Sequence, residues 1–203
     1  IDRCVFAKLT PLQARDLGIQ VIYQDLALFP NLSVAENIAF ELNLIGLLKA
    51  YRPRAIREMA ARVLNELNFD INLKTPVGHL PIAQRQQVAI CRALVADARL
   101  VIMDEPTASL TRAEVDNLLR TVNYLKGKNI SVVFVSHRLD EVLEISDRVT
   151  VIRDGIKVGT FAADRMDSRR LTELMTGRAV EHTPKLKQTA TDRVMLSVEG
   201  LSR

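Results

Sequence analysis

Hydrophobic residues in this chain fall into two patterns, short continuous runs and longer stretches with a helical repeat. The continuous runs are GIQVIY at 18–23, LVIM at 100–103 and ISVVFVS at 130–136, and they are rich in β-branched residues. Short apolar runs of this kind predict buried strands. Strands that are apolar at successive positions are typical of a parallel sheet whose two faces are both covered.

The clearest helical repeat covers residues 52–68. Its apolar positions recur at intervals of three and four residues: Ile56, Met59, Ala60, Val63, Leu64 and Leu67. This spacing places them on one face of a helix, and Pro53 suits the first helical turn. Similar patterns predict helices at 80–97, 111–125 and 138–146, and the first of these is apolar almost all round in its second half.

The order of these elements predicts an α/β fold with a largely parallel sheet and helices on both faces. The pair Asp154-Gly155 separates two β-like runs, which predicts a β-hairpin, and we expect that hairpin at one edge of the sheet. Residues 179–192 are polar and without periodicity, so they are expected to form a linker. The stretch 193–203 contains a new β-like run and is expected to begin a following domain.

Composition is that of an ordinary globular chain, long enough for one domain and part of another. Of 203 residues, 48% are hydrophobic, 26% charged and 4% aromatic. The net charge is +4, and the charged residues form no basic stripe, so nucleic-acid binding is not expected. Cys4 and Cys91 match no metal-binding spacing and favour a reducing, cytosolic setting. No apolar run approaches the roughly 18 residues of a membrane span.

Polar residues with useful chemistry lie at the ends of the predicted strands. Gln24 follows the first run, Asp104 and Glu105 follow the second, and His137 follows the third. Gln84 lies at the start of a predicted helix. Ligands of α/β sheets bind where the carboxyl ends of the strands meet. Taken singly, each residue has a structural alternative, as a turn glutamine, a satisfied histidine or a solvated strand end, but their order and spacing together favour one functional site.

Four segments in this order resemble the ABC transporter ATPases. They are VIYQD at 21–25, LPIAQRQQVAICRAL at 80–94, LVIMDEPTASLT at 100–111 and VVFVSHRLDEVLEISDRVTVIRDGIKVG at 132–159. The resemblance is closest to the ATPases of bacterial ribose- and galactose-type importers, in which one polypeptide carries two cassettes. It implies a P-loop NTPase (RecA-like) core, with a cassette at 1–178, a helical subdomain at about 30–96 and the first strand of a second cassette at 193–203.

The resemblance also implies roles for the residues at the strand ends. Asp104 is expected to hold Mg²⁺, and Glu105 to act as the general base for the attacking water. His137 is expected to contact the γ-phosphate, and Gln24 to reach both the metal and the water. These roles suit phosphoryl transfer, in which catalysis depends mostly on positioning and electrostatic stabilisation.

LPIAQ corresponds to the family pattern Leu-Ser-Gly-Gly-Gln, which binds the nucleotide held by the opposite cassette. Ile82, Ala83 and Gln84 are therefore expected to contact nucleotide at a helix N-terminus, which is a natural anion site. Pro81 removes the usual hydroxyl and one N–H donor, so this segment is expected to complete a weak nucleotide site; it can equally serve as a good first-turn residue. Ser109 belongs to a loop that resembles the one crossing the dimer interface.

The phosphate loop itself is missing. None of the 203 residues forms the pattern G-x-x-x-x-G-K-[ST], and the only Gly-Lys pair, at 127–128, is followed by Asn129. The resemblance places that loop upstream of Ile1, so we expect that the sequence begins inside a longer protein. Without the loop's strand and helix, apolar surface of the sheet is expected to lie bare and to require an association with another copy or a partner.

Two functions are expected from these observations. The first is the energy-coupling ATPase subunit of a sugar ABC importer, which uses ATP and Mg²⁺. It would be cytoplasmic and peripheral at the inner face of the membrane, bound to permease subunits and to a second cassette, in tandem or as a homodimer. The second is a catalytically inactive cassette that serves as an interaction module. A role in translation or DNA repair is a third alternative, which the sugar-importer-like segments disfavour.

Overall fold

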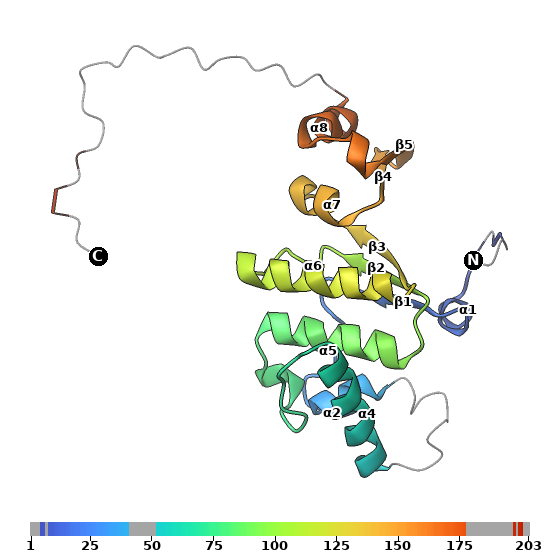
Figure 1. The fold of residues 1–203 in the computed structure, drawn as a ribbon, viewed down its shortest axis with the longest axis vertical. Helices are drawn as coiled ribbons and strands as arrows, with labels where there is room; N and C mark the ends of the chain where they lie inside the picture. Colours follow the sequence, from blue (N-terminus) through green and yellow to red (C-terminus); the bar gives the residue numbers. More distant parts are fainter. Residues whose placement is uncertain (1–4, 7, 41–51, 178–196, 198, 201–203) are drawn as a thin grey trace.

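The computed structural model describes residues 5–6, 8–40, 52–177, 197 and 199–200. Along its long axis, Figure 1 shows a group of helices at one end, a parallel sheet in the middle and a hairpin with two helices at the other end. The elements before the second strand of the sheet are α1 (Pro11–Asp16), β1 (Ile19–Ile22), α2 (Val34–Ile38), α4 (Pro53–Glu66), η1 (Val77–His79) and α5 (Ile82–Val95).

The three predicted strands form one parallel sheet in the order β1-β2-β3. After β1, its members are β2 (Leu100–Asp104) and β3 (Ser131–Val135). Met103 at the centre lies opposite Ile22 of β1 and Phe134 of β3, so the three strands end at the same edge. The α/β fold class predicted from the sequence is confirmed in this part of the chain.

The two faces of the sheet are covered unequally. Helices α5 and α6 (Arg112–Gly127) pack against one face, where Ile22, Val101 and Met103 are buried in a common core. On the opposite face, Val133 and Val135 of β3 are 45% and 46% exposed. Parallel strands are normally buried on both faces. The described residues therefore leave one apolar face partly open, as expected if further chain covers it.

Helices α2, α4 and α5 share a second core at one end of the molecule. It contains Val34 and Ile38 of α2, Ile56 and Ala60 of α4, and Val88 of α5. Helix α4 confirms the amphipathic helix predicted at 52–68. Helix α2 begins with a capping box, in which Ser33 and Glu36 satisfy each other's backbone N–H groups. The limits of a helical subdomain at about 30–96 stay a prediction.

A third core lies at the opposite end of the molecule, among α7, the predicted hairpin and the last helix. Its elements are α7 (Leu139–Ile145), β4 (Arg148–Arg153), β5 (Ile156–Ala162), η2 (Ala163–Arg165) and α8 (Ser168–Thr176). Asp154 and Gly155 join β4 to β5 with φ of 52° and 75°, which is the conformation of a type I′ hairpin turn. In the described part of the chain β4 pairs only with β5, so the hairpin is not hydrogen-bonded to the parallel sheet.

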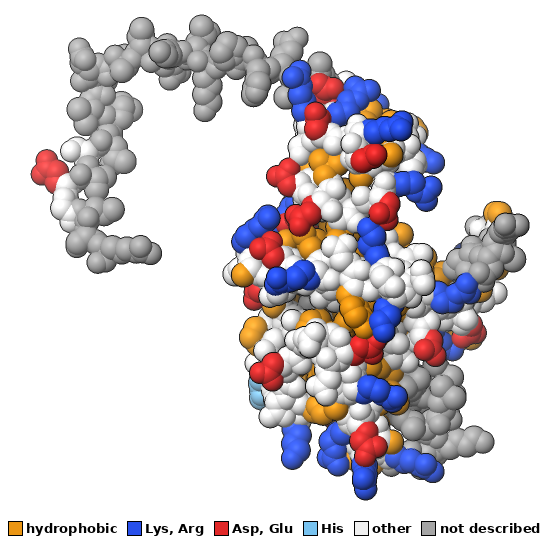
Figure 2. Space-filling model, viewed as in Figure 1, with side chains coloured by type: hydrophobic (Ala, Val, Ile, Leu, Met, Phe, Trp, Pro, Cys, Tyr) orange, Lys and Arg blue, Asp and Glu red, His pale blue; other side chains and the backbone are white. Residues whose placement is uncertain are grey.

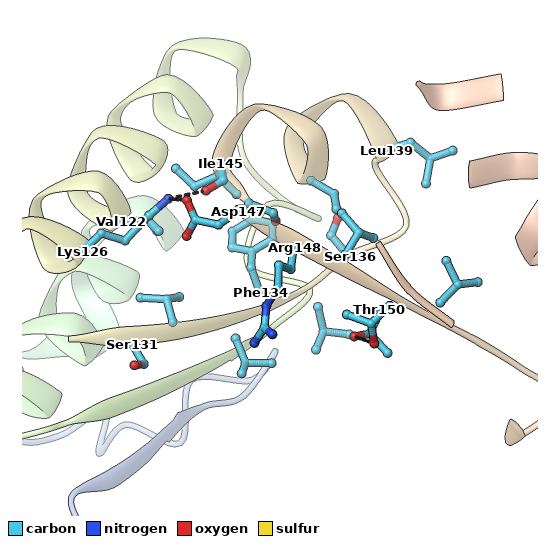
Figure 3. A pocket seen from close by; sticks show the side chains of 18 of the residues that line it. Val122, Lys126, Ser131, Phe134, Ser136, Leu139, Ile145, Asp147, Arg148 and Thr150 are labelled. Atoms are coloured by element: carbon cyan, nitrogen blue, oxygen red, sulfur yellow. Dashed lines mark hydrogen bonds and ion pairs between the residues drawn. The ribbon is translucent and has the colours of Figure 1, made fainter. Parts of the chain in front are cut away.

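A groove of about 870 Å³ separates β3 from β4. Figure 3 shows side chains from β3, α7 and β4 lining it, with Lys126 of α6 bonded to Asp147 and to the carbonyl of Ile145 at its rim. On the face shown in Figure 2, acidic and basic side chains are interspersed over most of the surface. Within the described ranges, every helix is too short or too polar to span a bilayer. The predicted linker at 179–192 lies outside the described residues.

Candidate functional site

The parallel register brings the ends of all three strands to one edge of the sheet. Asp104 is the last residue of β2 and lies opposite Val135 of β3. Glu105 follows directly and donates its backbone N–H to the carbonyl of Val135 (2.9 Å). Its φ is 45°, in the left-handed region that non-glycine residues rarely adopt. This turn carries the Glu105 side chain toward the neighbouring strand.

Glu105 and His137 are in direct contact. The Nδ1 atom of His137 lies 2.8 Å from Oε2 of Glu105, and their side chains are 70% and 26% exposed. This Oε2 is buried, yet it accepts no hydrogen bond of good geometry from any described residue. The short distance is therefore an electrostatic contact that becomes an ion pair when the imidazole is protonated. The carboxylate oxygen keeps its capacity to accept a proton or a hydrogen bond.

A small cavity joins Glu105 to Gln24. It has a volume of about 30 Å³, and four of the predicted site residues line it: Gln24, Ile82, Glu105 and Ser109. A polar cavity of this size can hold one water molecule. The structure thus gathers residues from β1, α5 and the segment after β2 around a single space, with His137 attached through Glu105.

Other predicted residues do not line this cavity. Asp104 is exposed at the end of β2. Gln84 is half-buried in the first turns of α5, whereas Ala83 lines a separate cavity of about 30 Å³ beside Phe69 and Glu114. Ala83 and Gln84 are expected to contact a nucleotide on an opposite cassette, and Asp104 is expected to hold Mg²⁺, so these roles stay predictions.

The N-terminus of α5 is open to solvent. Pro81 is its N-cap residue and provides no side-chain cap, and Ile82 is 40% exposed. The first N–H groups of a helix have no partner within the helix. Arg85 holds the preceding chain by donating to the carbonyls of Leu80 and Gly78 (both 2.8 Å). An anion could approach this helix end from solvent.

Thr111 lies at the end of the loop that contains Ser109, and its contacts are local. Its backbone N–H and hydroxyl both donate to the Glu114 carboxylate at 2.8 Å, at the start of α6. These hydrogen bonds lower the pKa of Glu114. Thr111 therefore serves the helix start.

The oxygen atoms at this edge suit a metal bound together with phosphate. Mg²⁺ is usually held by one or two carboxylates plus phosphate oxygens and water. The exposed carboxylate of Asp104 and the amide oxygen of Gln24 are ligands of that kind. Among the described residues no group of three or more His, Cys, Asp or Glu side chains is arranged to hold a metal ion alone. The residues fit a metal–nucleotide complex better than a free metal.

Sequence reasoning missed two buried polar side chains near the site. Gln86 lines the cavity beside Glu105, is 4% exposed and has no partner for Nε2. Thr107 is fully buried, with no partner for Oγ1. A buried polar group without a partner needs an explanation, such as a bound water. Gln86 lies in a polar run of the sequence, so nothing in the pattern marks it as buried.

The comparison with protein families gives a match that includes several residues of the candidate site. The family model described as ABC transporter matches residues 6–108, which include Gln24, the start of α5 and the Asp104-Glu105 pair. Among solved structures, a nucleotide-free ATP-binding cassette from an ABC transporter has a TM-score of 0.64 and 24% sequence identity. That comparison covers 76% of this chain and 64% of the solved chain, and it shows the likeness of fold.

Curated relatives are more similar in sequence. The ribose import ATP-binding protein RbsA of Burkholderia pseudomallei (strain K96243) is 41% identical over 197 residues, 95% of this chain. Ribose import ATP-binding protein RbsA 1 of Rubrobacter xylanophilus (strain DSM 9941 / JCM 11954 / NBRC 16129 / PRD-1) is 43% identical over 194 residues, 94% of this chain. In both comparisons the chain spans 38% of the relative's length.

Proposed function

Because the chain belongs to the ABC transporter family, we propose that it forms the ATP-hydrolysing part of the energy-coupling subunit of a sugar importer. Members of this family bind ATP. The names of the relatives, with about 40% identity over nearly the whole chain, support ribose or a related sugar as the transported class. Transport itself belongs to a larger assembly, and these residues would supply part of its ATP site.

The contact between Glu105 and His137 carries this proposal. In ATP hydrolysis a water molecule attacks the γ-phosphorus, its proton passes to a base, and the bond to the β–γ bridging oxygen breaks to leave ADP and phosphate. Glu105 suits the base because its Oε2 is buried and accepts no hydrogen bond from the described residues. His137 suits a phosphate contact because its ring is 70% exposed beside that carboxylate.

Other residues would orient the reactants. Asp104 and Gln24 would hold Mg²⁺ jointly with the phosphates, and the bound metal would neutralise charge on the phosphate oxygens. Gln24 lines the cavity beside Glu105, which supports a contact with the attacking water. Ile82, Ala83, Gln84 and Ser109 would face the nucleotide of the opposite cassette.

The test is Glu105→Gln in the full-length protein. We expect kcat for ATP hydrolysis to fall at least about 100-fold, which is the lower range for loss of a general base, while nucleotide binding is retained. Glu144→Gln on the exposed side of α7 is the matched control and is expected to leave kcat unchanged. Unchanged hydrolysis in Glu105→Gln would refute the proposed base.

The absence of the phosphate loop favours a second candidate function for these 203 residues alone, an interaction module. The loop normally supplies several charge-assisted contacts to phosphate, each worth about 1.5–3 kcal/mol. Without them binding would weaken by orders of magnitude, so we expect negligible hydrolysis by the isolated chain. Robust turnover that Glu105→Gln abolishes would contradict this expectation.

The open groove supports an association that covers β3. In the described part of the chain β3 pairs only with β2, so its other edge has no strand partner. Its outward face is apolar, with Val133 and Val135 nearly half exposed. We propose that a strand from the phosphate-loop region, or from a partner, occupies this space. Light scattering on the isolated chain should then show self-association, and a monodisperse monomer would count against the proposal.

The segment after β1 is the proposed contact with the permease. Phe29 is 41% exposed, and its ring lies 4.1 Å from that of Phe40. Phe29 follows Gln24 by five residues along the chain, so a partner that docks on this aromatic pair would be coupled to the ATP site through the intervening segment. Such docking would hold the chain at the inner face of the cytoplasmic membrane through its partner.

A further inference from the structure

The turn that follows Gln24 has an unusual backbone. Leu26 and Ala27 have φ of 61° and 43°, so two successive non-glycine residues lie in the left-handed region. The N–H of Leu26 donates to the carbonyl of Tyr23 (2.9 Å), which closes the turn. Backbone of this kind persists only where its surroundings hold it in place. The contacts around the turn should therefore identify what fixes it.

Core packing and hydrogen bonds from a distant helix hold the turn. The side chain of Leu26 is 6% exposed and packs in the core between the sheet, α5 and α6. Arg92 of α5 donates from Nη1 to the carbonyl of Ala27 (2.9 Å) and from Nη2 to the carbonyl of Leu26 (3.3 Å). The planar guanidinium presents two donors at a fixed spacing, which suits two neighbouring acceptors.

The segment 24–27 and helix α5 also both line the cavity of the candidate site. Gln24 precedes Leu26 by two residues and lines the cavity beside Glu105. Helix α5 also contributes Ile82, its first residue, to the wall of that cavity. A displacement of the turn relative to α5 would therefore move the Gln24 amide relative to the Glu105 carboxylate.

We propose that Arg92 is a positioning residue, which clamps the Leu26–Ala27 turn to α5 so that Gln24 stays beside Glu105. This proposal rests on the ATP-hydrolysing function proposed above. Arg92 acts through the turn, because it donates to two backbone carbonyls of the turn and does not line the cavity. Its loss would misplace Gln24 while the other groups that hold the nucleotide remain.

The test compares Arg92→Met and Arg92→Lys in the full-length protein. Methionine keeps an unbranched apolar chain without donors, and lysine keeps the charge without the fork. We expect Arg92→Met to lower kcat about tenfold with KM for ATP within about twofold, because only the orientation of Gln24 changes. Arg92→Lys is expected to resemble Arg92→Met more than the wild type. A purely structural role would reduce the amount of folded protein and leave kcat per folded molecule unchanged.

Hydrogen–deuterium exchange gives a readout that does not depend on ATP. In Arg92→Met the amides at 24–29 are expected to exchange faster, while those of β2 at 100–104 keep their rates. Arg57→Met is the matched control, because Arg57 is an exposed arginine on α4. We expect that variant to change neither kcat nor exchange.

The outcomes separate the two proposals. If Glu105→Gln abolishes hydrolysis while Arg92→Met keeps the wild-type kcat, the role of Arg92 is overturned and the proposed function stands. Unchanged exchange at 24–29 in Arg92→Met would overturn the clamp whatever the enzyme does. Absence of hydrolysis in the wild type would overturn the proposed function and with it the positioning role of Arg92 in hydrolysis.

Discussion

Asn37 is a completely buried polar side chain that holds the chain between β1 and α2. Its Oδ1 accepts the N–H of Phe29 (2.9 Å). Its Nδ2 lies 3.0 Å from the carbonyl of Phe29 and 3.1 Å from those of Leu32 and Ser33. Replacing Asn37 by Ala removes all of these interactions at once. We expect this substitution to lower the free energy of unfolding markedly, because these hydrogen bonds are lost and the N–H of Phe29 is left without its acceptor, although each of the three carbonyls keeps one backbone donor.

The magnitude follows from counting these bonds. An amide nitrogen carries two hydrogens, so Asn37 makes three effective hydrogen bonds even though three carbonyls lie within reach of Nδ2. At about 1 kcal/mol net for each bond, the loss is about 3 kcal/mol. Water that enters the space left by the side chain would reduce the loss, and the unsatisfied N–H of Phe29 would increase it. A decrease of about 2–4 kcal/mol is a large part of the roughly 5–15 kcal/mol that stabilises a typical domain.

The assay is equilibrium unfolding in urea, followed by circular dichroism. Asn31→Ala is the matched control, because Asn31 is exposed in the same segment and its replacement should change stability by no more than about 0.5 kcal/mol. The dependence of unfolding on urea concentration should stay constant, so that the midpoint alone reports the change. A loss below about 1 kcal/mol in Asn37→Ala, or an equal loss in both variants, would refute the reasoning.

Three further predictions concern other residues. Burial raises the pKa of the Cys91 thiol, so in a Cys4→Ser background a thiol reagent at pH 8 should label nothing in the native protein and one thiol after unfolding. A hydrogen bond from Tyr124 is the main cause that lowers the pKa of Glu66, so the ionised carboxylate stabilises the fold at neutral pH and this stabilisation is lost on acidification. The difference in stability between Glu66→Gln and wild type should therefore shrink below about pH 4. A difference in thermal midpoint that stays constant with pH would contradict this. The backbone of Glu105 has φ of 45°, which glycine adopts more readily than alanine. The free energy of unfolding of Glu105→Gly should therefore exceed that of Glu105→Ala by about 1 kcal/mol. Equal stability of the two variants in urea would show that no strain is stored at this residue.

Much of the fold could be predicted because its signals are local. The apolar runs at 18–23, 100–103 and 130–136 became β1, β2 and β3, and the pair Asp154-Gly155 forms the expected hairpin turn. The Ser33–Glu36 capping box is likewise formed by residues three positions apart. The hydrophobic pattern could not predict the left-handed turn at 26–27, because neither residue is glycine or asparagine. The turn is also held by Arg92, which is 65 residues away in the sequence.

The residues of the candidate site could be predicted from the order of the strands, whereas the contacts between these residues could not. Order along the chain identified Gln24, Glu105 and His137, since residues that end parallel strands must lie at one edge. The 2.8 Å contact between Glu105 and His137 could not be predicted, because it depends on the left-handed backbone conformation of Glu105. The burial of Gln86 likewise depends on which side of α5 faces the cavity.

The turn at Glu105 explains how two adjacent carboxylates can serve one site. In an extended strand, successive side chains point to opposite faces, so Asp104 and Glu105 would be separated by the sheet. Instead the chain leaves β2 at Asp104, and the N–H of Glu105 bonds to Val135 of the next strand. The resulting φ of 45° is unfavourable for glutamate by roughly 1–2 kcal/mol. It is held where the side chain meets His137, which follows β3, and lines the cavity shared with Gln24, which follows β1. The strained backbone at this one residue therefore directs Glu105 toward the groups that follow the other two strands.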